Sequence, residues 1–245
     1  MHAACRGSPS PDALRASTSP RKRGEVKNMQ RFLTDAVEFM PILLLGVRNT
    51  IIVTLGSLAL STVLGMVWAL MRVSGIRALA VVAVVVVNVI RGIPIIVQLF
   101  YIYFVLPDFG ITLSALQAAI IGLGIAYSAY QSENFRAGIE AIDRGQIESA
   151  YSLGLSWALT MRKVVLPQAI RIMLPPYGNI MIMMLKDSSQ ASTITVAELA
   201  LQGKLIASST FQNTTVFTLV AALYLVMSLP LIVLAGWLER RFGRK

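Results

Sequence analysis

A lysine and an aspartate stand side by side at positions 186 and 187, followed by Ser188 and Ser189. Residues 172–185, directly before Lys186 and Asp187, carry no charge. A Lys or Asp at the centre of a bilayer costs about 2.5–3.5 kcal/mol on insertion scales, so ionised residues beside an apolar segment are candidate functional residues. An ammonium and a carboxylate in one cavity could bind both ends of a zwitterion, and the two hydroxyls could add hydrogen bonds.

The pair also has a structural interpretation. Successive residues on a helix point about 100° apart, so the two side chains need not face one cavity. Lys186 could extend to lipid head groups at the outer membrane boundary, with its methylene stem in the apolar region. Asp187 would then be its ion-pair partner. The sequence leaves both interpretations open.

The composition indicates a membrane protein. The mean hydropathy is +0.68, 56% of the residues are hydrophobic and only 14% are charged. These values exclude an ordinary soluble domain. A spanning helix needs about 20 apolar residues. We therefore expect an all-α integral membrane protein with a bundle of five transmembrane helices, near residues 44–71, 78–106, 112–138, 172–190 and 213–238.

The second of these spans is interrupted by Arg91, Gly92 and Pro94. These residues could form a hinge or gate, or a structural kink in which Arg91 pairs with an acidic residue. Near the end of the third span, Glu133 and Arg136 are three residues apart, a spacing that suits an ion pair within one helix.

The fourth span is the least regular. Its charge-free part, 172–185, is too short to cross a membrane unless Lys186 and Asp187 enter with it. The sequence Pro175-Pro176-Tyr177-Gly178 predicts a break that would free backbone groups to face a polar cavity. We therefore take Lys186, Asp187, Ser188 and Ser189 as the candidate substrate pathway.

Five spans would place the chain ends on opposite sides of the membrane. Lys and Arg gather after the first span, after the third and at the C-terminus, so the positive-inside rule places the C-terminus in the cytoplasm and the N-terminus outside. Residues 1–28 contradict this pattern, being rich in Arg, Ser and Pro without an apolar signal-peptide core. We expect translation to begin at Met29, with 29–245 forming the membrane domain. A disordered native tail is the alternative.

The membrane domain lacks the residues of several common sites. The only cysteine, Cys5, and the only histidine, His2, precede Met29, so we predict no disulfide, no metal site and no catalytic residue. The motif G-x-x-x-x-G-K-[ST] is absent, because Gly203-Lys204 is followed by Leu205. The net charge of +10 falls to +6 without residues 1–28 (16 basic and 10 acidic residues remain). The remaining basic residues flank the spans and indicate a membrane boundary, not a nucleic-acid partner.

A polar segment follows the third span, with the sequence Gly145-Gln-Ile-Glu-Ser-Ala-Tyr-Ser-Leu-Gly154. The eight residues between the glycines make about two helical turns, roughly 12 Å, and glycine favours helix termination. Ile147, Ala150, Tyr151 and Gly154 share one face at i, i+3, i+4 and i+7. The segment predicts a short two-sided helix at the inner membrane surface. Taken alone, it could simply lie among the lipid head groups.

The pattern extends further, since nine residues separate Gly154 from Val164-Val-Leu-Pro167. Together the two segments resemble the signature loop E-A-A-x3-G-x9-I-x-L-P of the membrane subunits of ATP-binding-cassette (ABC) importers. Ser149 replaces the second Ala and Val164 replaces Ile. The resemblance implies that loop 143–167 docks a cytoplasmic ATPase. It assigns this coupling role to Gly145, Glu148, Ser149, Ala150, Gly154, Leu166 and Pro167.

Other segments resemble the polar amino acid branch of these permeases, which serves histidine, glutamate, glutamine, arginine and opines. The resemblance covers about residues 36–240 and is carried by Arg91–Phe100, Ser132–Gly138, Leu166–Arg171, Leu174–Asn179 and Leu185–Ser189. It implies the type I ABC importer permease fold in a bacterial inner membrane. It also implies a partner ABC ATPase that carries ATP and Mg, a second permease subunit, and an extracytoplasmic amino-acid-binding protein. It indicates neither which amino acid is carried nor whether the two permeases are identical.

Two other functions would fit a protein with several spans. A secondary transporter would need no ATPase and often shows inverted repeats, which we do not find in the sequence. A structural membrane protein would need neither the signature loop nor charged residues within a span. The sequence therefore favours an importer permease.

Overall fold

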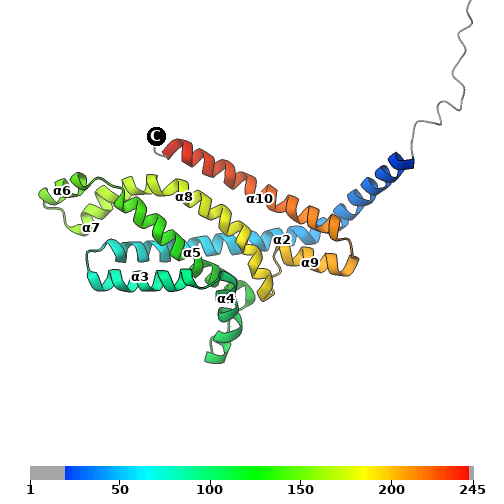
Figure 1. Cartoon of the computed structure of the whole chain (residues 1–245), viewed down its shortest axis with the longest axis horizontal. Helices are drawn as coiled ribbons and strands as arrows, with labels where there is room; N and C mark the ends of the chain where they lie inside the picture. The colour runs from blue at the N-terminus through cyan, green and yellow to red at the C-terminus, as the bar shows by residue number, and fades with distance from the viewer. Residues whose placement is uncertain (1–19, 243–245) are drawn as a thin grey trace, which may run out of the picture.

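The computed structural model describes residues 20–242. The expected N-terminal extension lies outside this range up to residue 19, and α2 already begins at Pro20, so the start at Met29 stays a prediction. All regular elements of the described range are helical (Figure 1). In chain order they are α2 (Pro20–Val73), α3 (Arg77–Gly92), α4 (Ile95–Phe100), η1 (Tyr101–Val105), η2 (Leu106–Phe109), α5 (Ala115–Glu140), α6 (Arg144–Ser152), α7 (Trp157–Thr160), η3 (Met161–Val165), α8 (Leu166–Asp187), η4 (Ser188–Ile194), α9 (Leu199–Thr210) and α10 (Asn213–Phe242).

The bundle is built around the contact of α5 with α2. A capping box begins α5: the Ser114 hydroxyl accepts a hydrogen bond from the Gln117 N–H, and the Gln117 side chain accepts one from the Ser114 N–H. Small residues then let the two helices approach closely. A Cβ on Gly65 of α2 would lie 2.6 Å from the Cβ of Gln131 on α5. Such small residues are typical of membrane bundles, where close packing supplies much of the association.

Three apolar clusters fill the spaces between the helices. One surrounds the middle of α5, a second joins α2 to α9 and α10, and a third packs beneath loop 143–167. The third cluster includes Phe135 of α5, Val165 of η3 and Met173 of α8. It therefore connects the loop directly to two long helices.

A buried carboxylate connects α9 to α10. Glu198 is fully buried, and its two oxygens accept hydrogen bonds from the N–H groups of Ala200 and Leu201, each at 2.8 Å, so it caps α9. The Tyr224 hydroxyl of α10 donates to the same carboxylate at 2.8 Å. A buried charge is tolerated only when such partners surround it.

The interruption predicted at Arg91, Gly92 and Pro94 is present. α3 and the segment that begins with α4 meet at an angle of 98°. Gln98 of α4 reaches back across the break and donates a 2.8 Å hydrogen bond from Nε2 to the carbonyl of Ile90 in α3. This contact braces the bend. A hinge or gate role for the three residues stays a prediction.

The break predicted at Pro175–Gly178 is wrong, because α8 is continuous and both prolines lie inside it. A proline removes a helical hydrogen bond, but neighbouring helices can hold the chain in place. The Tyr177 hydroxyl lies 2.8 Å from Thr62 Oγ1 of α2. One residue later, a Cβ on Gly178 would lie only 3.0 Å from the Cβ of Ala235 on α10. These contacts lock α8 between α2 and α10.

α8 also begins earlier than the charge-free run suggested. Its first residue is Leu166, and the regular α-helix ends where the 3-10 helix η4 begins at Ser188. Arg171 does not interrupt the helix. A charged side chain is unfavourable in contact with lipid, but it does not prevent the backbone from forming helical hydrogen bonds. The charge-free run therefore marked only the apolar part of a longer helix.

The described residues include two helices long and apolar enough to cross a membrane, Phe32–Val73 and Asn213–Phe242. The bent pair Arg77–Gly92 and Ile95–Phe109 would be a third if it forms one span. The count of five spans stays a prediction.

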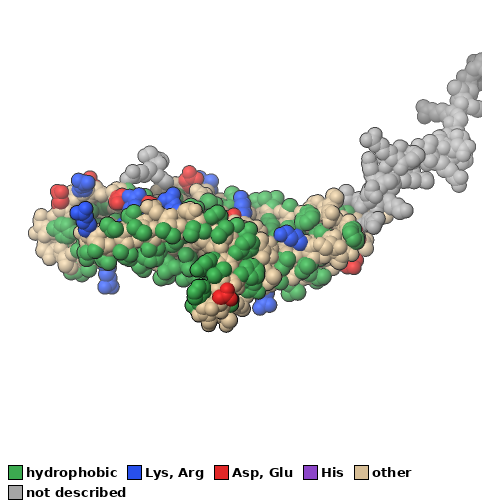
Figure 2. Space-filling view, turned by 60° about the horizontal axis from the view of Figure 1, so that its bottom comes forward, with side chains coloured by type: hydrophobic (Ala, Val, Ile, Leu, Met, Phe, Trp, Pro, Cys, Tyr) green, Lys and Arg blue, Asp and Glu red, His purple; other side chains and the backbone are tan. Residues whose placement is uncertain are grey.

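Figure 2 shows hydrophobic side chains over much of one face and several Lys and Arg side chains near the end that carries α6 and α7.

The contact between α8 and α10 predicts that Gly178→Val destabilises the fold, by about 1–3 kcal/mol, because the new side chain overpacks against Ala235. Thermal unfolding in detergent measures the change. Gly236→Val on α10 is the matched control, since the nearest atom to its Cβ is the end of the Arg240 side chain at 3.9 Å. Equal loss of stability in both variants would show that helix propensity, not packing, sets the effect.

Candidate functional site

The loop predicted to couple to an ATPase contains a well-defined short helix, α6. Asp143 begins it, because its Oδ1 accepts a hydrogen bond from the Gly145 N–H at 2.8 Å. Gly145 itself lies in the first turn, so the expectation that it terminates the helix is wrong. At the other end Gly154 has φ of +76°, the left-handed conformation that favours glycine. Its predicted role as a terminator is confirmed.

The two sides of α6 have different surroundings. Ala150 is buried and Ile147 packs against the apolar cluster beneath the loop. Glu148 and Ser149 are exposed. Tyr151 shares the face of Ile147 in the sequence pattern, yet it is 46% exposed. The helix is thus anchored by two apolar residues and presents a polar surface, at one end of the molecule (Figure 1).

The second half of the motif marks the start of α8. Val165 is fully buried at the end of the π-helix η3, and Leu166 packs against the same apolar cluster. Pro167 is the second residue of α8, directly after η3. Val165 and Leu166 therefore anchor the loop at the point where it joins the bundle, whereas Pro167 is exposed.

One carboxylate gathers three arginines from three helices. Glu133 of α5 pairs with Arg72 of α2 at 2.6 Å, with Arg136 of its own helix at 2.9 Å and with Arg91 of α3 at 3.5 Å. Arg91 also lies over the Tyr130 ring, 5.8 Å from its centre. The predicted pairing of Arg91 with an acidic residue and the predicted Glu133–Arg136 ion pair are both confirmed.

The four residues of the candidate substrate pathway have different surroundings and do not contact one common partner. The Asp187 carboxylate accepts a 2.7 Å hydrogen bond from the Tyr127 hydroxyl of α5. Lys186 is exposed and forms no ion pair with any other residue in the range 20–242. Ser188 is buried and donates to the Leu185 carbonyl, whereas Ser189 is partly exposed. Within this part of the chain, Asp187 is therefore oriented by α5 and not by its neighbour.

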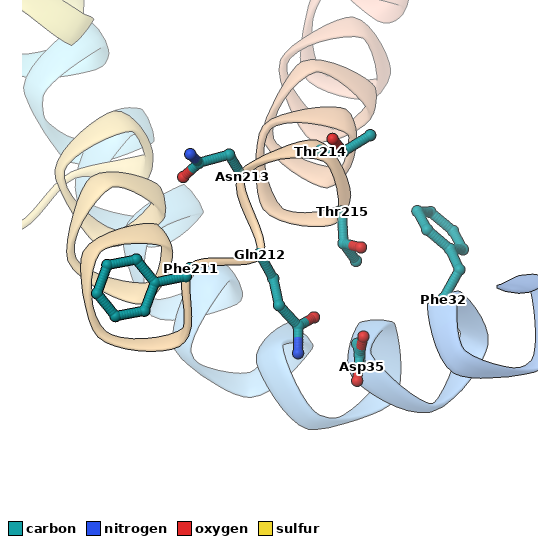
Figure 3. Close-up of a pocket in the computed structure, with 7 residues that line it drawn as sticks. All are labelled: Phe32, Asp35, Phe211, Gln212, Asn213, Thr214 and Thr215. Atoms are coloured by element: carbon teal, nitrogen blue, oxygen red, sulfur yellow. The ribbon is translucent and has the colours of Figure 1, made fainter.

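The structure adds a hollow that the sequence did not predict, at the end of the bundle opposite α6. It has a volume of about 520 Å³ and lies between α2 and the turn from α9 to α10. In Figure 3 the Asp35 and Gln212 side chains point toward each other, and Phe211 points away. Phe211 is 87% exposed and has φ of +57°. An exposed aromatic residue on a turn of this kind is a common feature of contact surfaces.

No group of three or more His, Cys, Asp or Glu residues that could hold a metal ion occurs within residues 20–242. The described residues form a helical bundle that carries the short helix α6 at one end.

A family model described as the binding-protein-dependent transport system inner membrane component matches residues 61–244. The chain belongs to this family. It is therefore a membrane-spanning permease subunit of an ABC importer and not an enzyme, and the match includes the whole of loop 143–167.

Individual relatives of the permease agree. It is 39% identical to a probable amino-acid ABC transporter permease protein, y4tG, of Sinorhizobium fredii, over 80% of this chain and 85% of that protein. It is 37% identical to the L-cystine transport system permease protein TcyB of Bacillus subtilis, over 84% and 88% of the two chains. The crystal structure of an amino acid ABC transporter with histidines matches with a TM-score of 0.78 and 39% identity, over 85% of this chain and 97% of that one. The type I importer permease fold is thereby confirmed.

The arginine cluster predicts that Glu133→Gln destabilises the permease by about 1–3 kcal/mol, because three guanidinium groups lose their shared carboxylate. Unfolding in detergent provides the measurement. Glu140→Gln is the control, since among the described residues Glu140 pairs with Arg136 alone and its side chain is 52% exposed, so its loss costs less than about 1 kcal/mol. Equal costs would contradict a central role for Glu133.

Proposed function

We propose that the permease is one of two membrane subunits that carry a polar amino acid inward across the inner membrane. A separate cytoplasmic ATPase, with its ATP and Mg, would drive the transport, and an extracytoplasmic binding protein would deliver the cargo. The relatives support an amino acid cargo, because both related permeases and the solved transporter are named for amino acid transport. The relatives are named for different amino acids, although each is about equally identical to the permease in sequence. Overall sequence similarity therefore does not indicate which amino acid the permease carries.

The observation that carries the proposal is the geometry of α6. The helix is capped at its start by Asp143, terminated by Gly154 and anchored by Ala150, so it can transmit a push as a rigid body. Its exposed Glu148 and Ser149 are free to contact another protein. Tyr151 and Leu153, near its C-terminal end, are also exposed and add an apolar part to the surface that a partner would meet.

We further propose that Asp187 contributes to the substrate pathway and binds the ammonium group of the amino acid. The Tyr127 hydroxyl holds the carboxylate in one orientation and leaves its second oxygen without a partner among the described residues. Lys186 is assigned to the same pathway in the complete transporter, where the second permease would complete the cavity. Ser188 and Ser189 begin η4, directly after this pair.

The orientation is part of the proposal. With the basic loops inside, α6 and the C-terminus face the cytoplasm, and the N-terminus lies outside. The binding protein would then meet the opposite end of the bundle, where the turn between α9 and α10 exposes Phe211.

ATP hydrolysis in proteoliposomes tests the whole proposal. The vesicles contain the permease, its ATPase and any sister permease, and the binding protein is added with a panel of polar amino acids. We expect one class of amino acid to stimulate hydrolysis. An assembled complex that no amino acid stimulates would contradict the proposed cargo.

Reversing the charge on the docking surface should detach the ATPase. Glu148→Arg is expected to lower co-purification of the ATPase about tenfold or more, because the new charge faces a surface that accommodates a carboxylate. Folding should not change, since Glu148 is exposed. Glu239→Arg on α10 is the control, an exposed reversal outside the loop. Unaltered co-purification of the Glu148 variant would exclude α6 as the docking surface.

Removing the charge of Asp187 should impair transport and leave ATPase docking intact. Asp187→Asn is expected to lower uptake several-fold in the proteoliposome assay, because an amide cannot neutralise an ammonium group. Asp108→Asn, at an exposed carboxylate in η2, is the matched control. Tyr127→Phe removes only the hydrogen bond to Asp187. If it lowers uptake as much as Asp187→Asn does, the carboxylate has a structural role.

A further inference from the structure

A cleft of about 640 Å³ opens between the start of α8 and the end of α10. It lies at the end of α8 that joins loop 143–167, and neither the transport pathway nor α6 includes it. Two basic and three apolar residues line it: Pro167, Ile170, Arg171, Arg241 and Phe242.

The cleft follows from how the two helices cross. They are closest where Gly178 meets Ala235, since a Cβ at Gly178 would be 3.0 Å from that of Ala235. Arg171 lies seven residues from this contact and Arg241 six, which is about 10 Å along each helix. Over that distance the helices separate and leave a wedge-shaped opening.

The mouth of the wedge carries uncompensated positive charge. Arg171 and Arg241 are both exposed, and neither forms an ion pair with a residue in the range 20–242. The nearest acidic residue along α10, Glu239, is exposed but does not line the cleft. Arg240, beside Arg241, is also exposed but does not line the cleft.

The wall of the wedge is apolar. Ile170 is 48% exposed although it lies beside the cleft. Phe242 is held in place by an edge-to-face contact with Trp237, with the ring centres 6.1 Å apart. Two arginines next to an apolar wall match an amphiphile, with an anionic group at one end and a hydrocarbon chain at the other.

We propose that this cleft binds an anionic phospholipid. The lipid phosphate would lie between the Arg171 and Arg241 guanidinium groups, which present forked donors that suit phosphate oxygens. One acyl chain would pass along Ile170 and Phe242 toward the bilayer. Basic pockets between membrane helices at the cytoplasmic boundary bind lipid head groups in the same manner. The apolar wall favours a lipid over a free phosphate ion, which would gain nothing from it.

The test is the binding of phosphatidylglycerol and phosphatidylcholine to the detergent-purified full-length permease, followed by native mass spectrometry. The preference for phosphatidylglycerol is expected to fall about tenfold or more in Arg171→Gln/Arg241→Gln. The control is Arg77→Gln/Arg240→Gln, which removes the same charge from exposed positions that do not line the cleft. It should keep the preference.

Two further measurements distinguish a bound phospholipid from a bound phosphate ion. Ile170→Ser should weaken phosphatidylglycerol binding, while inorganic phosphate at millimolar concentration should not displace the lipid. Equal loss of preference in the two double variants would overturn the proposal in favour of general surface charge. Displacement by phosphate, or an unaffected Ile170→Ser variant, would overturn it in favour of a simple anion site. Full retention of the preference by the Arg171→Gln/Arg241→Gln variant would also overturn the proposal, because the two arginines would then not bind the lipid phosphate.

Discussion

A charge inside an apolar bundle has to be neutralised by nearby groups, and this requirement organises the permease. Glu133 draws arginines from α2 and α3 onto α5, and Glu198 joins the start of α9 to α10. Packing removes much of the water around both carboxylates, so each depends on partners that the folded chain supplies. Removing the Glu133 carboxylate would leave Arg72 and Arg91 without their ion pair. The helices that look independent along the sequence are therefore linked through two acidic side chains.

Local patterns were sufficient for the features that depend on nearby residues. The three-residue spacing of Glu133 and Arg136 predicted their ion pair, and Gly154 predicted the end of α6. The helical class of the fold followed from composition, and the type I permease fold followed from the signature loop. The interruption near Pro94 was also evident, because a proline two residues after a glycine rarely continues a helix.

The features that sequence patterns missed depend on residues far apart in the chain. Nothing local indicated that Arg72 would meet Glu133, or that Tyr127 would orient Asp187. Glu198 could have been noticed, because it is the one acidic residue between Asp187 and Glu239 and stands just before an apolar run. The predicted break at Pro175 was wrong for a similar reason. The contacts of Tyr177 and Gly178 with α2 and α10 hold the helix together, and proline patterns do not report them.

The continuity of α8 has a mechanical consequence. One continuous helix joins Leu166, near the proposed docking helix α6, to Asp187, and it crosses α10 at Gly178. That crossing stands about 18 Å from the first residue and about 14 Å from the last. It can act as the fulcrum of a lever. A sideways displacement at the end proposed to meet the ATPase would then move the Asp187 end in the opposite direction by a slightly smaller amount, without any chain of side-chain rearrangements between them.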